Sequence, residues 1–236
     1  MASGIAARRG DVNEPVETFR VQYREQFIGP RYRGWAHFGF TLASTTALMA
    51  FCIHQLDAVR PVEWLTVPLT FIYANFAEYF GHRGPMHHLR PGLGKIFERH
   101  TRQHHRFFTE TRMAFDSTRD FKAVLFPPVL VLFFLLAFGT PIALLLGWIA
   151  TTNVAWLFAL TGTAYFLNYE LLHFSYHVPP ESWIARLPGM ASLRRHHTLH
   201  HDQRLMVHYH FNITYPIADR VMGTLHRPSA DSRSKP

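Results

Sequence analysis

Residues 149–177 read IATTNVAWLFALTGTAYFLNYELLHFSYH, and this stretch decides the fold class. Its apolar part, 149–172, is long enough to cross a bilayer as one helix, which needs about 20 residues. Two histidines follow, His173 and His177, spaced four apart so that they lie one above the other on a helix face. The stretch therefore predicts a membrane-spanning helix that ends in a pair of stacked imidazoles.

Three further apolar runs accompany this one. Two of them have the length of a spanning helix. The third is shorter, and Pro127-Pro128 forbids regular helix near its start, so it is expected to tilt or to continue through Pro141. Long apolar runs that alternate with segments rich in Arg and His are typical of a membrane protein with a polar face. The three runs are 35–56, 62–80 and 123–138.

The chain of 236 residues carries a net charge of +8, and its basic residues are unevenly placed. The links 57–61 and 139–148 hold one Arg between them, whereas the segment 82–122 and both ends of the chain are rich in Arg. Because basic residues gather on the cytosolic side of membranes, four spans put both termini and 82–122 on that side. Basic residues beside apolar runs also favour membrane-flanking loops over nucleic-acid binding.

We therefore predict an all-α, multi-pass membrane protein with about four transmembrane helices and a cytosolic, histidine-rich helical cap. Its expected location is a bacterial inner membrane or the endoplasmic reticulum. The alternative is a soluble bundle of four buried helices. The expected organisation is a cytosolic N-terminal segment at 1–34, a membrane-embedded domain at 35–225 and a disordered tail at 226–236. The first residues show no apolar signal sequence, and the single Cys52 excludes a disulfide framework.

Histidines are the most unusual part of the composition, with seventeen in the chain. Six lie in 82–105 and eight in 173–210, both on the predicted cytosolic side. The H-x3-H spacing of 173–177 recurs at 100–104 and 197–201, and imidazoles one helical turn apart can bind one ion. About ten such ligands exceed the needs of one ion and suit two ions held close together.

The spacing of His82 and His87 differs, because residues five apart diverge on a straight helix. Gly84-Pro85 lies between them and is expected to end the helix and turn His87 back toward His82. Isolated histidines are interpreted as ordinary polar residues, and others are left without a role. The first set is His37, His54 and His226, and the second is His88, His196, His208 and His210.

The histidine units disfavour several other kinds of metal site. None has Glu in second place, as the H-E-x-x-H motif of a zinc peptidase requires. Neither the two-His-one-carboxylate iron triad nor the paired Glu-x-x-His motifs of carboxylate-bridged di-iron bundles is evident. The PGLGK stretch at 91–95 lacks the spacing of a phosphate-binding loop.

Four histidine boxes, in order along the chain, resemble those of the integral-membrane fatty acid hydroxylase/sterol desaturase superfamily. The first, EYFGHRGPMH at 78–87, is similar to the E-x3-H-R-x3-H motif of that superfamily. One box alone would be weak, but four in order between apolar runs are specific. The other three are HTRQHH at 100–105, YELLHFSYH at 169–177 and HTLHH at 197–201.

The closest resemblance is to the fatty acid 2-hydroxylase branch, because of the extra H-x3-H at 173–177 and the DSTR stretch at 116–119. Asn212 and DRVMGT at 219–224 look like the closing motif of the superfamily. The chain departs from the branch at His100, which lies four residues before His104 where a three-residue step is usual.

The resemblance implies a di-metal site with two iron ions, or zinc in a purified form, and O2 as the oxidant. Carboxylates are expected to orient the ligands through their second ring nitrogen, and Glu170 is favoured because a charge inside a span is costly. The other candidates for this role are Glu78, Glu98, Asp116 and Asp202. The implied ligands are His82, His87, His100, His104, His105, His173, His177, His197, His200 and His201.

These features predict an oxidoreductase, an O2-dependent di-iron oxygenase that hydroxylates an unactivated C–H bond of a lipid or fatty-acyl chain. A desaturase, sterol methyl oxidase or carotenoid hydroxylase on the same site is an alternative. A third possibility is a non-enzymatic metal transporter or buffer, although transport would favour polar residues through the spans. No haem-binding H-P-G-G motif precedes the spans, so a separate electron donor of ferredoxin or cytochrome type is expected beside the lipid substrate and the membrane.

Overall fold

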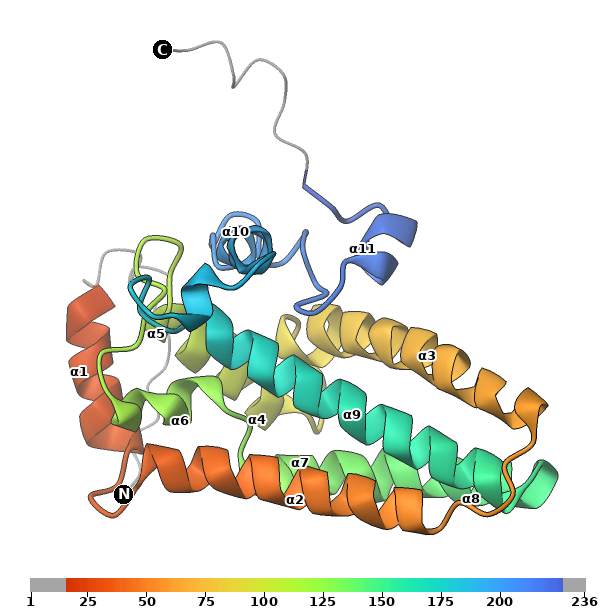
Figure 1. The fold of residues 1–236 in the computed structure, drawn as a ribbon. Coiled ribbons are helices and arrows are strands. Elements are labelled where there is room, and N and C mark those ends of the chain that lie inside the picture. The colour runs from red at the N-terminus through yellow and green to blue at the C-terminus, as the bar shows by residue number, and fades with distance from the viewer. Residues whose placement is uncertain (1–15, 227–236) are drawn as a thin grey trace.

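The computed structural model describes residues 16–226, and every regular element in that range is a helix (Figure 1). The central helix is α9 (Thr152–Tyr176), which packs against α2 (Gly34–His54), α3 (Thr66–Gly81) and α8 (Thr140–Ile149). The all-helical prediction is confirmed for the described residues. The expectations for residues 1–15 and for the tail at 227–236 lie outside them.

Helix α9 begins with an N-cap, in which a threonine side chain accepts a hydrogen bond from a backbone N–H of the first turn. The hydroxyl oxygen of Thr151 accepts a hydrogen bond from the N–H of Val154, which is an N-cap interaction. The same hydroxyl donates to Glu63, whose carboxylate also accepts from the N–H of Arg60, so the start of α9 is fastened to the turn η1 (Pro61–Leu65). At its other end α9 carries His173 in regular helix.

Helix α2 corresponds to the first predicted span and begins at a glycine for a steric reason. The carbonyl of Thr118 and the ring of Phe121 lie so close to Gly34 that a Cβ there would overlap both. By length and composition, α2 is the one described helix that could cross a membrane, and the apolar helical segment Leu136–Ile149 is shorter. The count of four spans therefore stays a prediction.

The third predicted run is a chain of short helices rather than one straight span. The helix α6 (Phe121–Val124) stops before Pro127-Pro128, as proline requires. The chain then continues from α7 (Pro128–Phe134) through the π-helical η5 (Leu135–Gly139) into α8. Pro141 lies in the first turn of α8, where its missing N–H is tolerated, so the helical path passes through it.

A cap of short helices covers one end of the bundle, where α10 (Met190–His200) and α11 (Ile217–Val221) lie over the ends of α9 and α3 (Figure 1). The N-terminal α1 (Val16–Phe27) packs on α5 (His105–Phe107) through Tyr23 and Phe107, whose rings meet edge to face. The remaining elements are η2 (His82–Met86), α4 (Gly94–Phe97), η3 (Glu98–His104), η4 (Thr118–Asp120) and η6 (Ile184–Arg186).

Candidate metal centre

Ten buried histidines converge under the cap in two groups of five. Within each group, one ring nitrogen of every histidine lies within 4.8 Å of the corresponding nitrogen of the other four. The groups adjoin, because the rings of His105 and His201, one from each, have centroids 4.3 Å apart. Group A comprises His82, His87, His100, His105 and His200, and group B comprises His104, His173, His177, His197 and His201.

Two π-helical turns, rather than a helix end, bring together the residues of group A that are five apart. The helix α3 does not stop at Gly84-Pro85, as the sequence suggests, but widens into η2, which includes Pro85. A π-helix bonds residue i to residue i+5, so it places His87 over His82. Their Nε2 atoms lie 3.1 Å apart.

The same geometry at η3 corrects a second expectation. The four-residue spacing predicts that His100 and His104 share an ion, yet they belong to different groups. Because η3 is also π-helical, His100 pairs with His105 instead, at 3.1 Å between Nε2 atoms. The residues that are four apart on regular helix, at 173–177 and 197–201, do lie together in group B.

The protonation pattern makes both groups suitable for cations. In group A, a backbone carbonyl faces Nδ1 of both His82 and His200, and a carbonyl can only accept, so each Nδ1 carries the proton. Their Nε2 atoms then present lone pairs, 3.1 and 3.0 Å from Nε2 of His87. A single N–H on His87 could serve only one of them. A cation between these nitrogens would satisfy all three.

Group B repeats this arrangement. His177 and His201 also donate from Nδ1 to carbonyls, so both direct a bare Nε2 at Nε2 of His197, at 3.1 and 3.0 Å. Burial lowers the pKa of His201 to about 3, and it lowers the pKa of His82 in group A to about 4. These imidazoles are therefore neutral near pH 7, which is the form that binds a metal ion.

Backbone carbonyls, and not the expected carboxylates, hold the second nitrogen of five of these histidines at 2.5–3.3 Å. Among the described residues, no carboxylate is hydrogen bonded to any of the ten. Every residue has a carbonyl, so no side-chain pattern could reveal this role. The pairs are His82 with Phe211, His200 with Tyr209, His104 with Ala123, His177 with Met113 and His201 with Phe108.

Four of the five predicted carboxylates have other partners. Glu98 and Asp202 make ion pairs near the surface, and Asp116 joins a network with α1. Glu78 is enclosed by donors from α9 and from the C-terminal segment. The partners are Thr214 and Tyr165 for Glu78, Arg102 for Glu98, Arg24 for Asp116 and Arg204 for Asp202.

Glu170 differs from these four. Its Oε2 accepts a hydrogen bond from the N–H of Phe126, while its Oε1 is buried without a partner among the described residues. Nδ1 of His173, three residues further along α9, is also buried without one. The predicted orienting role of Glu170 stays open on this geometry.

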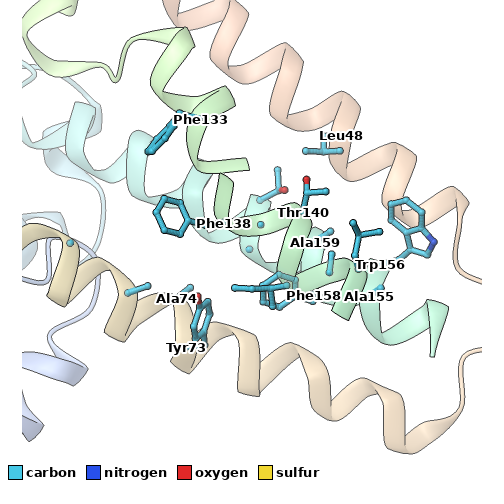
Figure 2. Close-up of a pocket in the computed structure, with 18 of the residues that line it drawn as sticks. Leu48, Tyr73, Ala74, Phe133, Phe138, Thr140, Ala155, Trp156, Phe158 and Ala159 are labelled. Carbon is cyan, nitrogen blue, oxygen red and sulfur yellow. The ribbon is translucent and has the colours of Figure 1, made fainter. Parts of the chain in front are cut away.

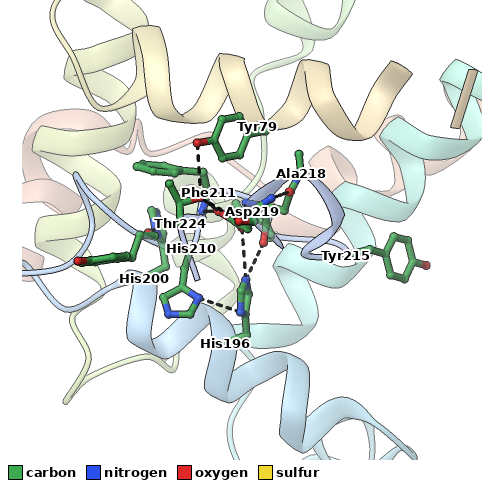
Figure 3. A network of polar contacts seen from close by, with 12 residues as sticks. Tyr79, His196, His200, His210, Phe211, Tyr215, Ala218, Asp219 and Thr224 are labelled. Atoms are coloured by element: carbon green, nitrogen blue, oxygen red, sulfur yellow. Dashed lines mark hydrogen bonds and ion pairs between the residues drawn. The ribbon is translucent and has the colours of Figure 1, made fainter. Parts of the chain in front are cut away.

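The buried residue that organises the carbonyls of group A is not among the predicted site residues. Asp219 in α11 accepts hydrogen bonds from the N–H groups of Phe211 and Asn212 at 3.0 and 2.7 Å (Figure 3). Asn212 in turn donates to the carbonyl of Asn75 in α3. We call residues 209–224 the C-terminal clasp, because they fasten the carbonyls of Tyr209 and Phe211 over α3. The only sequence signal was the likeness of 219–224 to a family motif.

The histidines without a predicted role lie outside both groups. His196 bonds through Nδ1 to Nδ1 of His210 and through Nε2 to the carbonyl of Asn212 (Figure 3). The exposed His88 contacts the carbonyl of Arg83. Through these contacts His196 packs against the C-terminal clasp, of which His210 is a member.

Two cavities lie next to the histidine groups. The larger, of about 940 Å³, lies between α3 and the η5–α8 stretch, with α9 along its floor (Figure 2). Apolar side chains such as Tyr73, Phe138 and Phe158 line most of it. The smaller, of about 290 Å³, reaches both groups, because His100, His104 and His173 line it. The basic residues Lys95 and Arg99 and several apolar residues complete its lining.

A helical protein with two adjoining groups of five buried imidazoles belongs to the class of histidine-box metalloproteins. The sequence profile described as fatty acid hydroxylase matches residues 67–224, more than half of the chain. The chain therefore belongs to the fatty acid hydroxylase family, within the superfamily that the four boxes indicate. Members are usually associated with membranes. No curated protein and no solved structure matches the chain.

Proposed function

We propose that the protein is an O2-dependent di-iron oxygenase that hydroxylates an unactivated C–H bond of a lipid or fatty-acyl chain, as in the 2-hydroxylase branch. The observation that carries this proposal is the pair of adjoining groups, each offering five neutral imidazoles to one ion. Bound iron would supply the activation of O2. Imidazole is a suitable ligand for iron, and the described groups contain no thiolate or carboxylate.

The chain itself contributes orientation and a dry surrounding. The carbonyls at Nδ1 fix the tautomer and the ring plane of five ligands before any ion binds. All ten histidines are buried, which keeps bulk water away from the reacting carbon. The apolar lining of the large cavity suits an aliphatic substrate, because a ligand pocket of this kind gains affinity from apolar burial.

The proposal includes a multi-pass membrane topology with the cap on the cytosolic side. Large apolar side chains are exposed along several helices, among them Leu69 on α3 at 68 % and Trp148 on α8 at 84 %. Exposed apolar surface on this scale is unusual for a soluble monomer and suits contact with lipid. The Lys and Arg of 82–122 lie at the cap end, which supports the sidedness.

A separate electron donor completes the proposal. Inserting one oxygen atom of O2 into a C–H bond and reducing the other to water consumes a pair of electrons and two protons. The substrate does not supply that pair. We expect it to come from a ferredoxin or cytochrome type of carrier that docks on the cap.

Lipid analysis of cells tests the reaction. Cells that express the chain, cells that express a His200→Ala variant and cells without the gene are extracted, and their lipids are compared by mass spectrometry. We expect a hydroxylated lipid that only the first cells contain and that carries ¹⁸O from ¹⁸O2. A new double bond would instead identify a desaturase. No difference in any hydroxylated or unsaturated lipid would contradict an oxygenase.

Metal analysis of the purified protein separates the enzyme from a metal buffer. We expect two tightly held ions per chain, one for each group. Labile uptake that grows with added metal, without O2-dependent turnover, would favour the buffer.

A further inference from the structure

The two cavities share a short stretch of wall. Met86 and Ile96 line both of them, and no other described residue does. Met86 is buried, with 8 % of its surface exposed, so its side chain fills the interior between the cavities. A molecule that passes from the large cavity to the small one must therefore pass these two side chains.

Both side chains are held next to metal-binding candidates. Met86 directly precedes His87, and its carbonyl accepts a hydrogen bond of 2.6 Å from the hydroxyl of Thr101 in η3. Ile96 in α4 is four residues before His100, on one continuous helical stretch with η3. Met86 and Ile96 therefore lie on the same two helical segments that carry four members of group A.

The cavities differ in size and in surroundings. The small one, of about 290 Å³, is at the lower end of ordinary ligand pockets and contains His100, His104 and His173, from both groups. The large one, of about 940 Å³, is at the upper end. Two of its lining residues, Phe138 and Leu144, are 54 % and 69 % exposed, so it opens on the apolar outer surface of the bundle.

We infer that the two cavities form one bent substrate path, with Met86 and Ile96 as its constriction, and that the substrate presents an unbranched aliphatic chain to the metals. The chain enters from the lipid side, lies along the large cavity and passes one segment between the two side chains into the small cavity. This inference rests on the proposed function and names the two side chains that control access of the substrate to the metals.

Photolabelling tests the path without requiring turnover. Two palmitic acids, one with a diazirine near the carboxyl end and one near the methyl end, are crosslinked to the purified protein, and the modified residues are mapped by mass spectrometry. In the unmodified chain we expect one probe to label the small cavity, at Val124 or Leu125, and the other to label the large cavity, at Ala143 or Ala159.

Larger side chains at the constriction provide the decisive variants. In Met86→Trp, and separately in Ile96→Trp, labelling of the small cavity should fall at least tenfold while labelling of the large cavity persists. Met86→Leu conserves the volume, and Leu89→Trp adds a ring at a residue that is 64 % exposed and lines neither cavity, so both should label as the unmodified chain does.

The outcomes separate this inference from the proposed function. Undiminished labelling of the small cavity in folded Trp variants overturns the constriction, and so does the absence of small-cavity labelling in the unmodified chain. If the Trp variants do not fold, the labelling of the unmodified chain still decides, because the path requires label in both cavities. If the labelling pattern is as expected but no lipid is oxidised, the substrate path stands and the oxygenase proposal fails.

Discussion

Group A and group B offer an ion the same chemistry, five buried imidazoles, but different parts of the chain hold them in place. The carbonyls that orient group A come from Tyr209 and Phe211 in the C-terminal clasp. Those that orient group B come from Phe108, Met113 and Ala123, on the segment 108–123 that runs from the end of α5 into α6. Two nearly equivalent sites therefore depend on regions that are about a hundred residues apart in sequence.

The two supports also differ in their physical character. The C-terminal clasp is closed by buried hydrogen bonds to Asp219, which is fully buried. The segment 108–123 is instead tied to α1 by ion pairs, in which Arg24 meets Asp120 at 2.8 Å and Asp116 at 2.7 Å. The side chains of Arg24 and Asp116 are partly exposed, so salt screens them more than the clasp. We expect the support of group B to be the weaker one.

The largest expected effect comes from replacing His200 or His201, which are adjacent in sequence but belong to different groups. His200→Ala should empty group A and His201→Ala should empty group B, so each variant should retain about one of the two ions expected for the intact chain. Loss of the proposed oxygenase activity should exceed the roughly 100-fold effect of removing an outer partner of a ligand. Elemental analysis of the purified variants and product formation measure the two effects.

His88→Ala is the matched control, because His88 is exposed next to His87 and belongs to neither group. It should retain both ions. If His200→Ala and His201→Ala each lose both ions, the two groups are one cooperative site and the distinction between them fails.

A smaller effect should follow from removing the charge that closes each support. In Asp219→Asn, an amide N–H can face the N–H of Phe211 or Asn212, so the clasp loses a charge-assisted hydrogen bond worth about 1.5–3 kcal/mol. We expect roughly 10- to 100-fold weaker metal binding in group A and little change in group B. Competition with a chelator during metal titration measures both affinities.

Asp120→Asn is the counterpart on the other support. It weakens the ion pair with Arg24, and the resulting loss of metal should fall on group B. The difference from the unmodified chain should shrink at high ionic strength, because salt already screens the ion pair there. Equal losses in both groups for both variants would show that the supports are not independent.

The sequence predicted the composition of this site better than its local geometry. The four boxes contain all ten histidines of the two groups, and regular helix at 173–177 brings its two histidines together as the spacing indicates. The π-helical turns at η2 and η3 were not predicted, because no residue type marks a π-helix. His100 was therefore paired with His104 instead of His105.

The outer partners were largely beyond prediction for a different reason. A carbonyl that orients a histidine carries no sequence signal. The contacts that position these carbonyls are also distant in sequence, since Asn75 accepts a hydrogen bond from the N–H of Ala218, 143 residues away. The long helices were easier to predict. Both ends of α2 lie within two residues of the ends of the predicted run at 35–56. The run at 123–138 was harder, because its prolines divide it into short helices whose continuation depends on packing.

The smallest expected effect concerns the one predicted carboxylate that has an unused oxygen. Oε1 of Glu170 and Nδ1 of His173 are both buried without partners among the described residues, three residues apart on α9. When Nε2 of His173 binds an ion, its ring must keep the proton on Nδ1, and a nearby carboxylate is a good acceptor for it. Glu170 would then do in group B what a carbonyl does for His104, His177 and His201.

Glu170→Gln keeps the shape and an oxygen for the N–H of Phe126 but removes the charge. We expect metal binding in group B to weaken by no more than about tenfold, at the low end of outer-partner effects, with group A unchanged. Glu98→Gln is the control, since Glu98 is paired with Arg102 at the surface and should leave both groups unaffected. Unchanged affinity of group B in Glu170→Gln would show that His173 needs no carboxylate acceptor.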